Sequence, residues 1–419
     1  MWCLAAAPAM AQPLAQFLSS AERANLDART GAQARERAEA EFAQAWGGLL
    51  PSLTASGGWT HNQYDAVLGF PTGATSSTTV VIVPKNQLDA TFKAEVPLLA
   101  PSRWLETAAA SSSARAAVRR DQSTREQVHR QVVSAFYAYL GARAVLESAQ
   151  RSLALSQAQV EVTAARTAAG VANELELMRG RAEVERNQQL VADAESLVAT
   201  GARTLETLSG LSPGEVPPLP LDSLEPVPPL EPLLARGVDG RPAVQAADED
   251  VTAASRTSAA ATLALVPSVN AQFTQRFTNA TGFQDQSALS NAGLTFSWRL
   301  DVPAVAGLRA LRAGQETALI AAERARRQAA DQLHADWQKA KASVKKVSAA
   351  RAQVAAARRA SSLAHERNLA GVATQLDVIQ SERDLFSAEL GDIQASAELA
   401  SARALLAISA GEPLQGAGP

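Results

Sequence analysis

Four short segments of the chain alternate between apolar and polar residues with the period of two that is typical of a β-strand. They are residues 52–62, 87–97, 268–278 and 291–300. About ten residues is the length that a tilted strand needs to cross a bilayer. The long helices expected elsewhere must use their apolar faces on one another, so we expect lipid to cover the apolar faces of these strands. The residues expected to face lipid are Leu53, Trp59, Leu88, Phe92, Val269, Phe273, Leu294, Phe296 and Trp298.

Longer Ala-rich segments follow the period near 3.5 of packed helices. Two long helices are expected over about 103–168 and 307–368. In the first, Val128, Val132 and Tyr139 begin one apolar seam, and Phe136 and Leu140 begin a second seam beside it. A helix with two seams has neighbours on both sides. The first long helix spans roughly 100 Å at 1.5 Å per residue.

Shorter helices are expected before and after each long one. A helix over 13–47 precedes the first strand, and return helices over 173–209 and 373–409 are about half as long as the long helices. We expect the two short helices of the first half to stack end to end beside its long helix. A loop rich in Gly, Thr and Ser is expected between the first two strands.

A repeat organises these elements. Gly371 follows Gly170 by 201 positions (371 − 170), and Pro267 follows Pro51 by 216 (267 − 51). Each Gly separates two helical segments, as a residue in the left-handed conformation does at a helix C-terminus. We expect hairpin tips here, formed by Ala169, Gly170, Val171, Ala172, Ala370, Gly371, Val372 and Ala373.

The chain therefore divides into two copies of one unit, residues 12–210 and 241–411, followed by a tail over 412–419. The linker over 211–240 is rich in proline, which predicts a stiff, extended connector. Pro242 is expected in the first turn of the next helix. The expected fold is mainly α-helical with membrane β-strands.

Composition and charge narrow the function. A net charge of −3 with dispersed Lys and Arg gives no footprint for nucleic acid. Residues 1–11 end in an A-x-A pattern that resembles a residual signal peptide cleaved after Ala11, although the charged n-region is missing. Either the start codon lies further upstream or this is an ordinary apolar N-terminus. Cys3, the single cysteine, falls in this segment.

Signatures of catalysis and cofactor binding are absent from the sequence. It contains no GxSxG, Walker, GxGxxG or HExxH motif. His61, His129, His334 and His365 are too scattered to predict a metal site. We therefore expect no enzyme, no cofactor and no metal.

Several segments, in this order over two copies, resemble the TolC family of outer-membrane efflux proteins. The best match runs from Ala370 to Ile379 and continues from Arg383 to Glu389. Leu50-Pro51-Ser52-Leu53 and Val266-Pro267-Ser268-Val269 are similar to the family's first-strand entries, and Val96-Pro97-Leu98-Leu99 resembles the end of its second strand. The segment after the linker that starts at Arg241-Pro242 is also similar. The resemblance covers about residues 12–411.

The resemblance implies a homotrimer in which each chain gives four strands to a twelve-stranded barrel, continued by an α-helical barrel in the periplasm. Elementary physics agrees in part: four strands cannot close a barrel, and an open edge cannot sit in lipid, so an oligomer is required. The implied location is the Gram-negative outer membrane. The implied function is a passive exit channel for substrates from an inner-membrane pump of the RND, ABC or MFS type, joined by a periplasmic adaptor (membrane fusion) protein.

The resemblance also assigns the sites. Glu176 and Asp377, each six residues after a tip Gly, match acids that ring the family's pore constriction, and Gln380 stands where the family has a second acid. The tips would contact the adaptor. Two other interpretations stay open: Glu176 and Asp377 favour the start of a helix through its dipole, and the small tip residues serve only the turn. For the whole chain, the alternatives are a soluble periplasmic coiled-coil scaffold, or a hydrolase or binding protein.

Overall fold

A computed structural model describes residues 12–71, 77–220, 224–298 and 302–412. The expected signal peptide and most of the tail lie outside these residues. The chain forms two compact units. One, the helical unit, combines Met1–Ala34, Arg119–Gln245 and Glu323–Pro419, and the other, the strand unit, combines Arg35–Val118 and Ala246–Ala322. Each unit draws on both halves of the chain.

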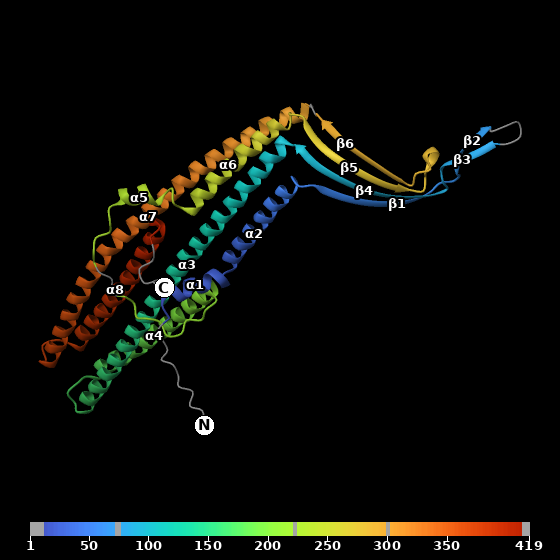
Figure 1. Ribbon diagram of the computed structural model, residues 1–419. Coiled ribbons are helices and arrows are strands. Elements are labelled where there is room, and N and C mark those ends of the chain that lie inside the picture. The colour runs from blue at the N-terminus through green and yellow to red at the C-terminus, as the bar shows by residue number, and fades with distance from the viewer. Residues whose placement is uncertain (1–11, 72–76, 221–223, 299–301, 413–419) are drawn as a thin grey trace, which may run out of the picture. The chain divides into compact units, whose positions relative to one another are not determined.

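The helices match the expected repeat in length (Figure 1). The long helices α3 (Pro101–Ala168) and α7 (Val302–Leu369) have 68 residues each. The return helices α4 (Glu174–Ser209) and α8 (Gln375–Ala410) have 36 residues each. In the helical unit the two seams of α3 are buried and pack with residues of four other helices. The main cluster contains Phe17, Leu18, Ala21, Val128, Val132, Val133, Phe136, Tyr139, Leu140, Leu205 and Leu405.

Two expectations for the helices are wrong. The helix expected over 13–47 is two helices, α1 (Leu14–Ala24) and α2 (Leu26–Gly47), separated at Asn25. The connector expected to be extended contains a further helix, α5 (Leu230–Gly237). Its Leu233 and Leu234 pack against a buried cluster that includes Leu333 and Leu406. Proline did not prevent this helix because Pro232 falls in its first turn, where a backbone N–H has no partner to lose.

Asn25 joins the ends of two short helices. Its Nδ2 donates a hydrogen bond to the carbonyl of Leu208 in the last turn of α4 (3.0 Å), and its Oδ1 accepts one from the backbone N–H of Asp27 at the start of α2 (2.9 Å). Gly210, just past α4, lies so close to α1 that an added Cβ would come within 2.5 Å of the Cβ of Ala24. The end of α4 therefore meets the start of α2, as the expected end-to-end stacking requires.

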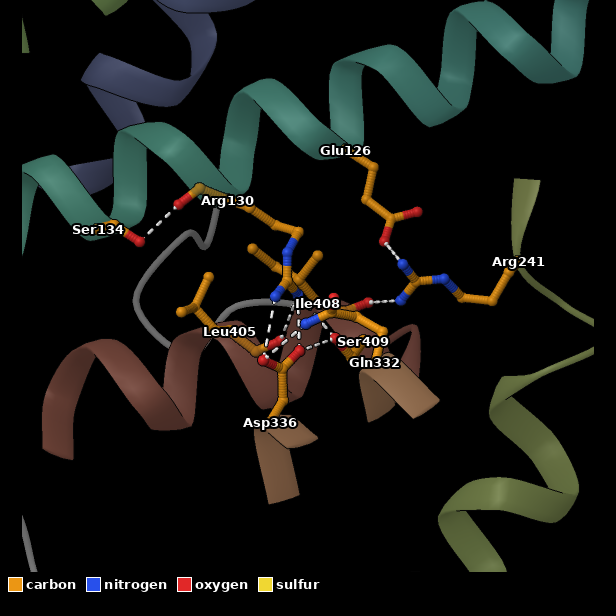
Figure 2. Close-up of polar contacts among 9 residues, drawn as sticks. All are labelled: Glu126, Arg130, Ser134, Arg241, Gln332, Asp336, Leu405, Ile408 and Ser409. Carbon is orange, nitrogen blue, oxygen red and sulfur yellow. Dashed lines mark hydrogen bonds and ion pairs between the residues drawn. The ribbon is translucent and has the colours of Figure 1, made fainter. Parts of the chain in front are cut away.

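The second half of the chain has an equivalent junction with different chemistry. Arg241 follows Asn25 by 216 positions (241 − 25), the offset already seen between Pro51 and Pro267. It precedes α6 (Pro242–Leu263), which starts at the proline expected in its first turn. The Nη1 of Arg241 donates to the carbonyl of Ile408 near the end of α8 (3.3 Å), and its Nη2 lies 2.5 Å from Oε1 of Glu126 on α3 (Figure 2).

A second charged group beside this junction ties three helices together. Arg130 of α3 forms two contacts with Asp336 of α7, at 2.8 and 3.0 Å. The same guanidinium donates to Oγ of Ser409 in α8 (2.7 Å), and Ser409 in turn donates to Asp336 (Figure 2). Gln332 Nε2 adds a third donor to this carboxylate, at 3.1 Å. The side chain of Asp336 is only 7% exposed, so its charge depends on these partners.

The strand unit contains a four-stranded antiparallel sheet in the order β1-β4-β5-β6. Its strands are β1 (Ser52–His61), β4 (Asn86–Leu99), β5 (Ser268–Thr278) and β6 (Ala288–Ser297). The central pair, β4 and β5, joins the two halves of the chain, with Lys93 opposite Thr274. β6 begins and ends about three residues before the range expected for it. Trp298 follows the strand, and its indole N–H donates to the carbonyl of Leu265 (3.0 Å); residues 299 and 300 lie outside the described part.

The apolar face of this sheet is exposed in the chain. The exposed fraction ranges from 45% for Phe92 to 78% for Leu53 among the residues expected to face lipid, apart from Val269, which is half-buried. Because β4 and β5 pair side by side, these side chains form one continuous apolar surface. A surface of this kind needs an apolar environment to cover it.

The expectation of a loop after β1 is wrong for most of this segment. A second hairpin forms there from β2 (Ala66–Pro71) and β3 (Ser77–Val83). Val80-Val81-Ile82-Val83 is a run of β-branched residues, which favour strands, and it outweighs the neighbouring Gly, Thr and Ser. Phe70 of the hairpin lies against Phe283 of the short 3₁₀ helix η1 (Gly282–Gln284), with ring centroids 5.7 Å apart.

Breaking the Arg130–Asp336 contact should destabilise the helical unit. Arg130→Met leaves a buried carboxylate without its cation, which we expect to cost about 3 kcal/mol of unfolding free energy. Thermal and urea unfolding followed by circular dichroism would measure this. The control is Arg151→Met, which removes an exposed ion pair with Glu147 on the same helix and should change stability by less than about 0.5 kcal/mol. Equal effects of the two substitutions would contradict this prediction.

Glu126 should make stability depend on pH. Burial raises the pKa of Glu126, against the lowering by Arg241 and Arg130. A raised pKa in the folded state means that this carboxyl contributes stability that is fully present below its unfolded pKa and is lost as the pH rises through the folded value. Glu126→Gln should therefore flatten the fall of the melting temperature just above pH 4.5, the ordinary value. Glu147→Gln on the exposed face of α3 should leave that slope unchanged.

Candidate functional site

The two hairpin tips have the same backbone geometry. After α3, Gly170 has φ = 74°, and after α7, Gly371 has φ = 73°. In both tips the next two N–H groups donate back to one carbonyl in the preceding helix: Val171 and Ala172 to Arg166, and Val372 and Ala373 to Arg367. Such bonds satisfy carbonyls at a helix C-terminus, and a left-handed residue permits them. This is the role expected for both glycines.

The tips also present a small apolar surface. Val171 is 69% exposed and Val372 is 67% exposed. A Cβ added to Gly170 or Gly371 would meet no atom within 4 Å, so the chain itself leaves both tips open. The expected contact of the tips with an adaptor has no counterpart in a single chain and stays a prediction.

The first turns after the tips differ in their caps. Asn173 caps α4 by accepting a hydrogen bond from the N–H of Leu175 (3.0 Å). Thr374 caps α8 through a capping box with Asp377, whose Oδ2 accepts from the backbone N–H and the hydroxyl of Thr374, both at 2.8 Å. These two donors lower the pKa of Asp377, so its carboxylate keeps its charge into acidic solution. The helix-start role of Asp377 is therefore confirmed.

The acids expected in a constriction lie at accessible positions near the tips. Asp377 and Gln380 are exposed on α8, and Glu176 is half-buried in the first turn of α4. In the described part of the chain, no hydrogen bond or ion pair joins Glu176 to either of them. Gln380 instead donates to Oδ1 of Asp384, one turn further along α8 (3.0 Å). Asp384 was not among the expected site residues, although it lies seven residues after Asp377 and thus on the same helix face.

Behind this face, a charged network links the two return helices. Arg383 of α8 donates to Glu183 of α4 through Nε (2.9 Å) and through its Nη2. Arg186 binds the other oxygen of Glu183 at 3.0 Å. The side chain of Glu183 is 7% exposed, so its carboxylate depends on these two cations.

A second pair extends this network to α7. Nε2 of His365 lies 2.8 Å from Oε1 of Glu382 on α8. Burial raises the pKa of Glu382, against the lowering by His365, and the nearby Glu183 raises it further. His365 is half-buried beside this acid, at a contact between two helices. No local sequence pattern indicates the Glu183–Arg383 contact, because these residues lie 200 positions apart and on different copies of the repeat.

The described residues contain no cluster of His, Cys, Asp or Glu that could hold a metal ion. Over the same residues, each helix is either too short or too polar to cross a membrane.

Three solved structures with a similar fold are outer-membrane proteins, and two of them are described as channels. The CmeC channel of Campylobacter jejuni matches with a TM-score of 0.79 at 16% identity, covering 95% of this chain and 85% of its own. VceC of Vibrio cholerae matches with a TM-score of 0.78 at 16% identity, covering 96% of this chain and 97% of its own. MtrE of Neisseria gonorrhoeae in its open state matches with a TM-score of 0.78 at 20% identity, covering 96% and 90%. At these identities the similarity establishes the fold.

The family follows from the sequence itself. No curated protein sequence matches the chain. The family model for outer membrane efflux proteins, however, matches residues 17–211 and 234–412, which is most of both copies of the repeat. The resemblance to TolC-like proteins is thus confirmed, and the chain belongs to the outer membrane efflux protein family.

Proposed function

We propose that this chain forms the exit channel of a tripartite efflux or secretion system, as a homotrimer that conducts substrates passively. The observation that carries the proposal is the four-stranded sheet. One face is apolar and exposed, the other is polar, and among the described residues β1 and β6 each pair along one edge only. Open edges cannot remain unpaired in lipid, so the free edges must pair with further copies.

In this proposal the sheets of three copies make a twelve-stranded barrel, with the apolar face toward lipid and the polar face toward water. The helices continue the channel as an α-helical barrel in the periplasm. Glu176, Asp377 and Gln380 line its constriction, with Asp384 one turn beyond Gln380. The network of Glu183, Arg383, Glu382 and His365 braces the return helices behind it.

The partners would meet the channel at the tips. The exposed Val171 and Val372, held by rigid glycine turns, suit an end-on contact with the helical hairpins of a periplasmic adaptor. An inner-membrane pump of the RND, ABC or MFS type would supply the energy, since the sequence has no nucleotide-binding motif. The chain is therefore a conduit in this proposal, without enzymatic activity. The soluble scaffold is disfavoured because the chain belongs to an outer-membrane family.

Purified protein should behave as a membrane-embedded trimer. We expect it in detergent extracts of outer membranes, with a native mass of three chains, and we expect conducting pores when it is added to planar lipid bilayers. A stable, water-soluble monomer obtained without detergent would overturn the proposed function.

Removing the acids of the constriction should reduce ion selectivity. Three copies bring acids to one narrow passage, which concentrates cations there. We expect the wild-type pore to prefer cations and to be blocked by trivalent cations. Glu176→Gln/Asp377→Asn should lower the ratio of cation to anion permeability roughly tenfold and relieve the block, as measured by reversal potentials in a salt gradient.

The control for this experiment separates charge from helix capping. Thr374→Ala removes the hydroxyl that caps α8 and binds Asp377, but it keeps both carboxylates. It should retain the cation preference and the block. If selectivity is unchanged in Glu176→Gln/Asp377→Asn, these acids do not line the constriction, whereas the trimeric channel itself would stand.

A further inference from the structure

The polar face of the four-stranded sheet carries four charged side chains besides the uncharged polar ones. Asp89, Lys93 and Glu95 lie on β4, and Arg276 lies on β5. Alternate residues of a strand share a face, so Asp89, Thr91, Lys93 and Glu95 lie on one face of β4. Arg276 lies opposite Thr91 and therefore shares this face. The described strands β1 and β6 add no acidic or basic residue other than His61. The face therefore has two acids and two bases.

Each acid on this face is bonded to one of the bases. Arg276 donates to Oδ1 of Asp89 through both Nε (2.9 Å) and Nη2 (2.6 Å). Nζ of Lys93 lies 2.8 Å from Oε2 of Glu95. Each carboxylate also accepts a hydrogen bond from an uncharged amide. Gln87 donates to Asp89 (2.6 Å) and Asn270 donates to Glu95 (3.2 Å).

The two pairs act as separate neutral units. Asp89 and Lys93 are four residues apart, which is about 13 Å along a strand. The charges within each pair are much closer than the Debye length of about 8 Å at physiological ionic strength. At greater distances each pair presents almost no net charge to a passing ion.

From this pairing we propose that Arg276 and Lys93 cancel the acidic charges of the barrel lumen, so that this part of the channel does not select its cargo by charge. This inference rests on the proposed channel function. It assigns ion selection to the helical part of the channel, whereas the strand-lined part does not distinguish its cargo by charge. The lumen keeps its charged, hydrated surface, but removing either member of a pair would turn it into a selective ring of three equal charges in the trimer.

The test uses opposite substitutions of one pair, in the Glu176→Gln/Asp377→Asn background so that the constriction contributes little. Arg276→Gln leaves Asp89 uncompensated and should raise the ratio of cation to anion permeability roughly threefold or more. Asp89→Asn leaves Arg276 uncompensated and should lower the ratio by a similar factor. Combining both substitutions should return the ratio to that of the background, because a neutral pair replaces an ion pair. Reversal potentials in planar bilayers report all three.

Salt dependence separates this effect from a structural one. At 10 mM salt the Debye length is about 30 Å and the shifts should be large, whereas at 1 M it is about 3 Å and they should vanish. A distorted barrel would shift both single variants in the same direction and at every salt concentration, which would overturn the proposal. Failure of the parent protein to form pores would instead reject the channel function itself.

Discussion

The ends of the short helices impose the constraint on which the helical unit depends. A helix terminus leaves several backbone carbonyls without intrahelical partners, and burying them unpaired is costly. α4 and α8 both end inside this unit, beside the start of another helix. Asn25 binds the carbonyl of Leu208 at one such end, and Arg241 binds that of Ile408 at the other. These two side chains allow pairs of short helices to accompany each long one.

Both junctions provide hydrogen-bond donors to carbonyls at a helix end, but they differ in electrostatic cost. Asn25 is neutral and satisfies both a donor and an acceptor on its own. Arg241 brings a charge into a half-buried position and requires Glu126 as its partner. Burial lowers the pKa of Arg241 and raises that of Glu126, so desolvation opposes the charged form of each more strongly than their mutual contact favours it. The duplicated copies have thus diverged where they contact the rest of the unit, while their tips have kept one geometry.

Local sequence patterns predict much of this architecture. The elements that they do not predict depend on contacts between residues that are distant in sequence. Period-two and period-3.5 patterns and the glycine breaks locate the main strands, long helices and tips because each reflects a local preference. The break at Asn25 depends on the end of α4, and α5 depends on a cluster with Leu333 and Leu406. For the candidate site, the capping role of Asp377 could be predicted from its position. The network of Glu183 and Arg383 could not, because it forms only when two return helices meet.

Among the described residues β1 and β6 each have one unpaired edge, and these edges constrain how the proposed channel is made. A single copy cannot enter the bilayer first and find its partners later, because its edge N–H and C=O groups would have to shed water with nothing to replace it. It cannot wait long in the periplasm either, since the same edges and the exposed apolar face invite pairing with unrelated strands. In the proposed channel, membrane insertion and subunit association would therefore have to be one concerted event.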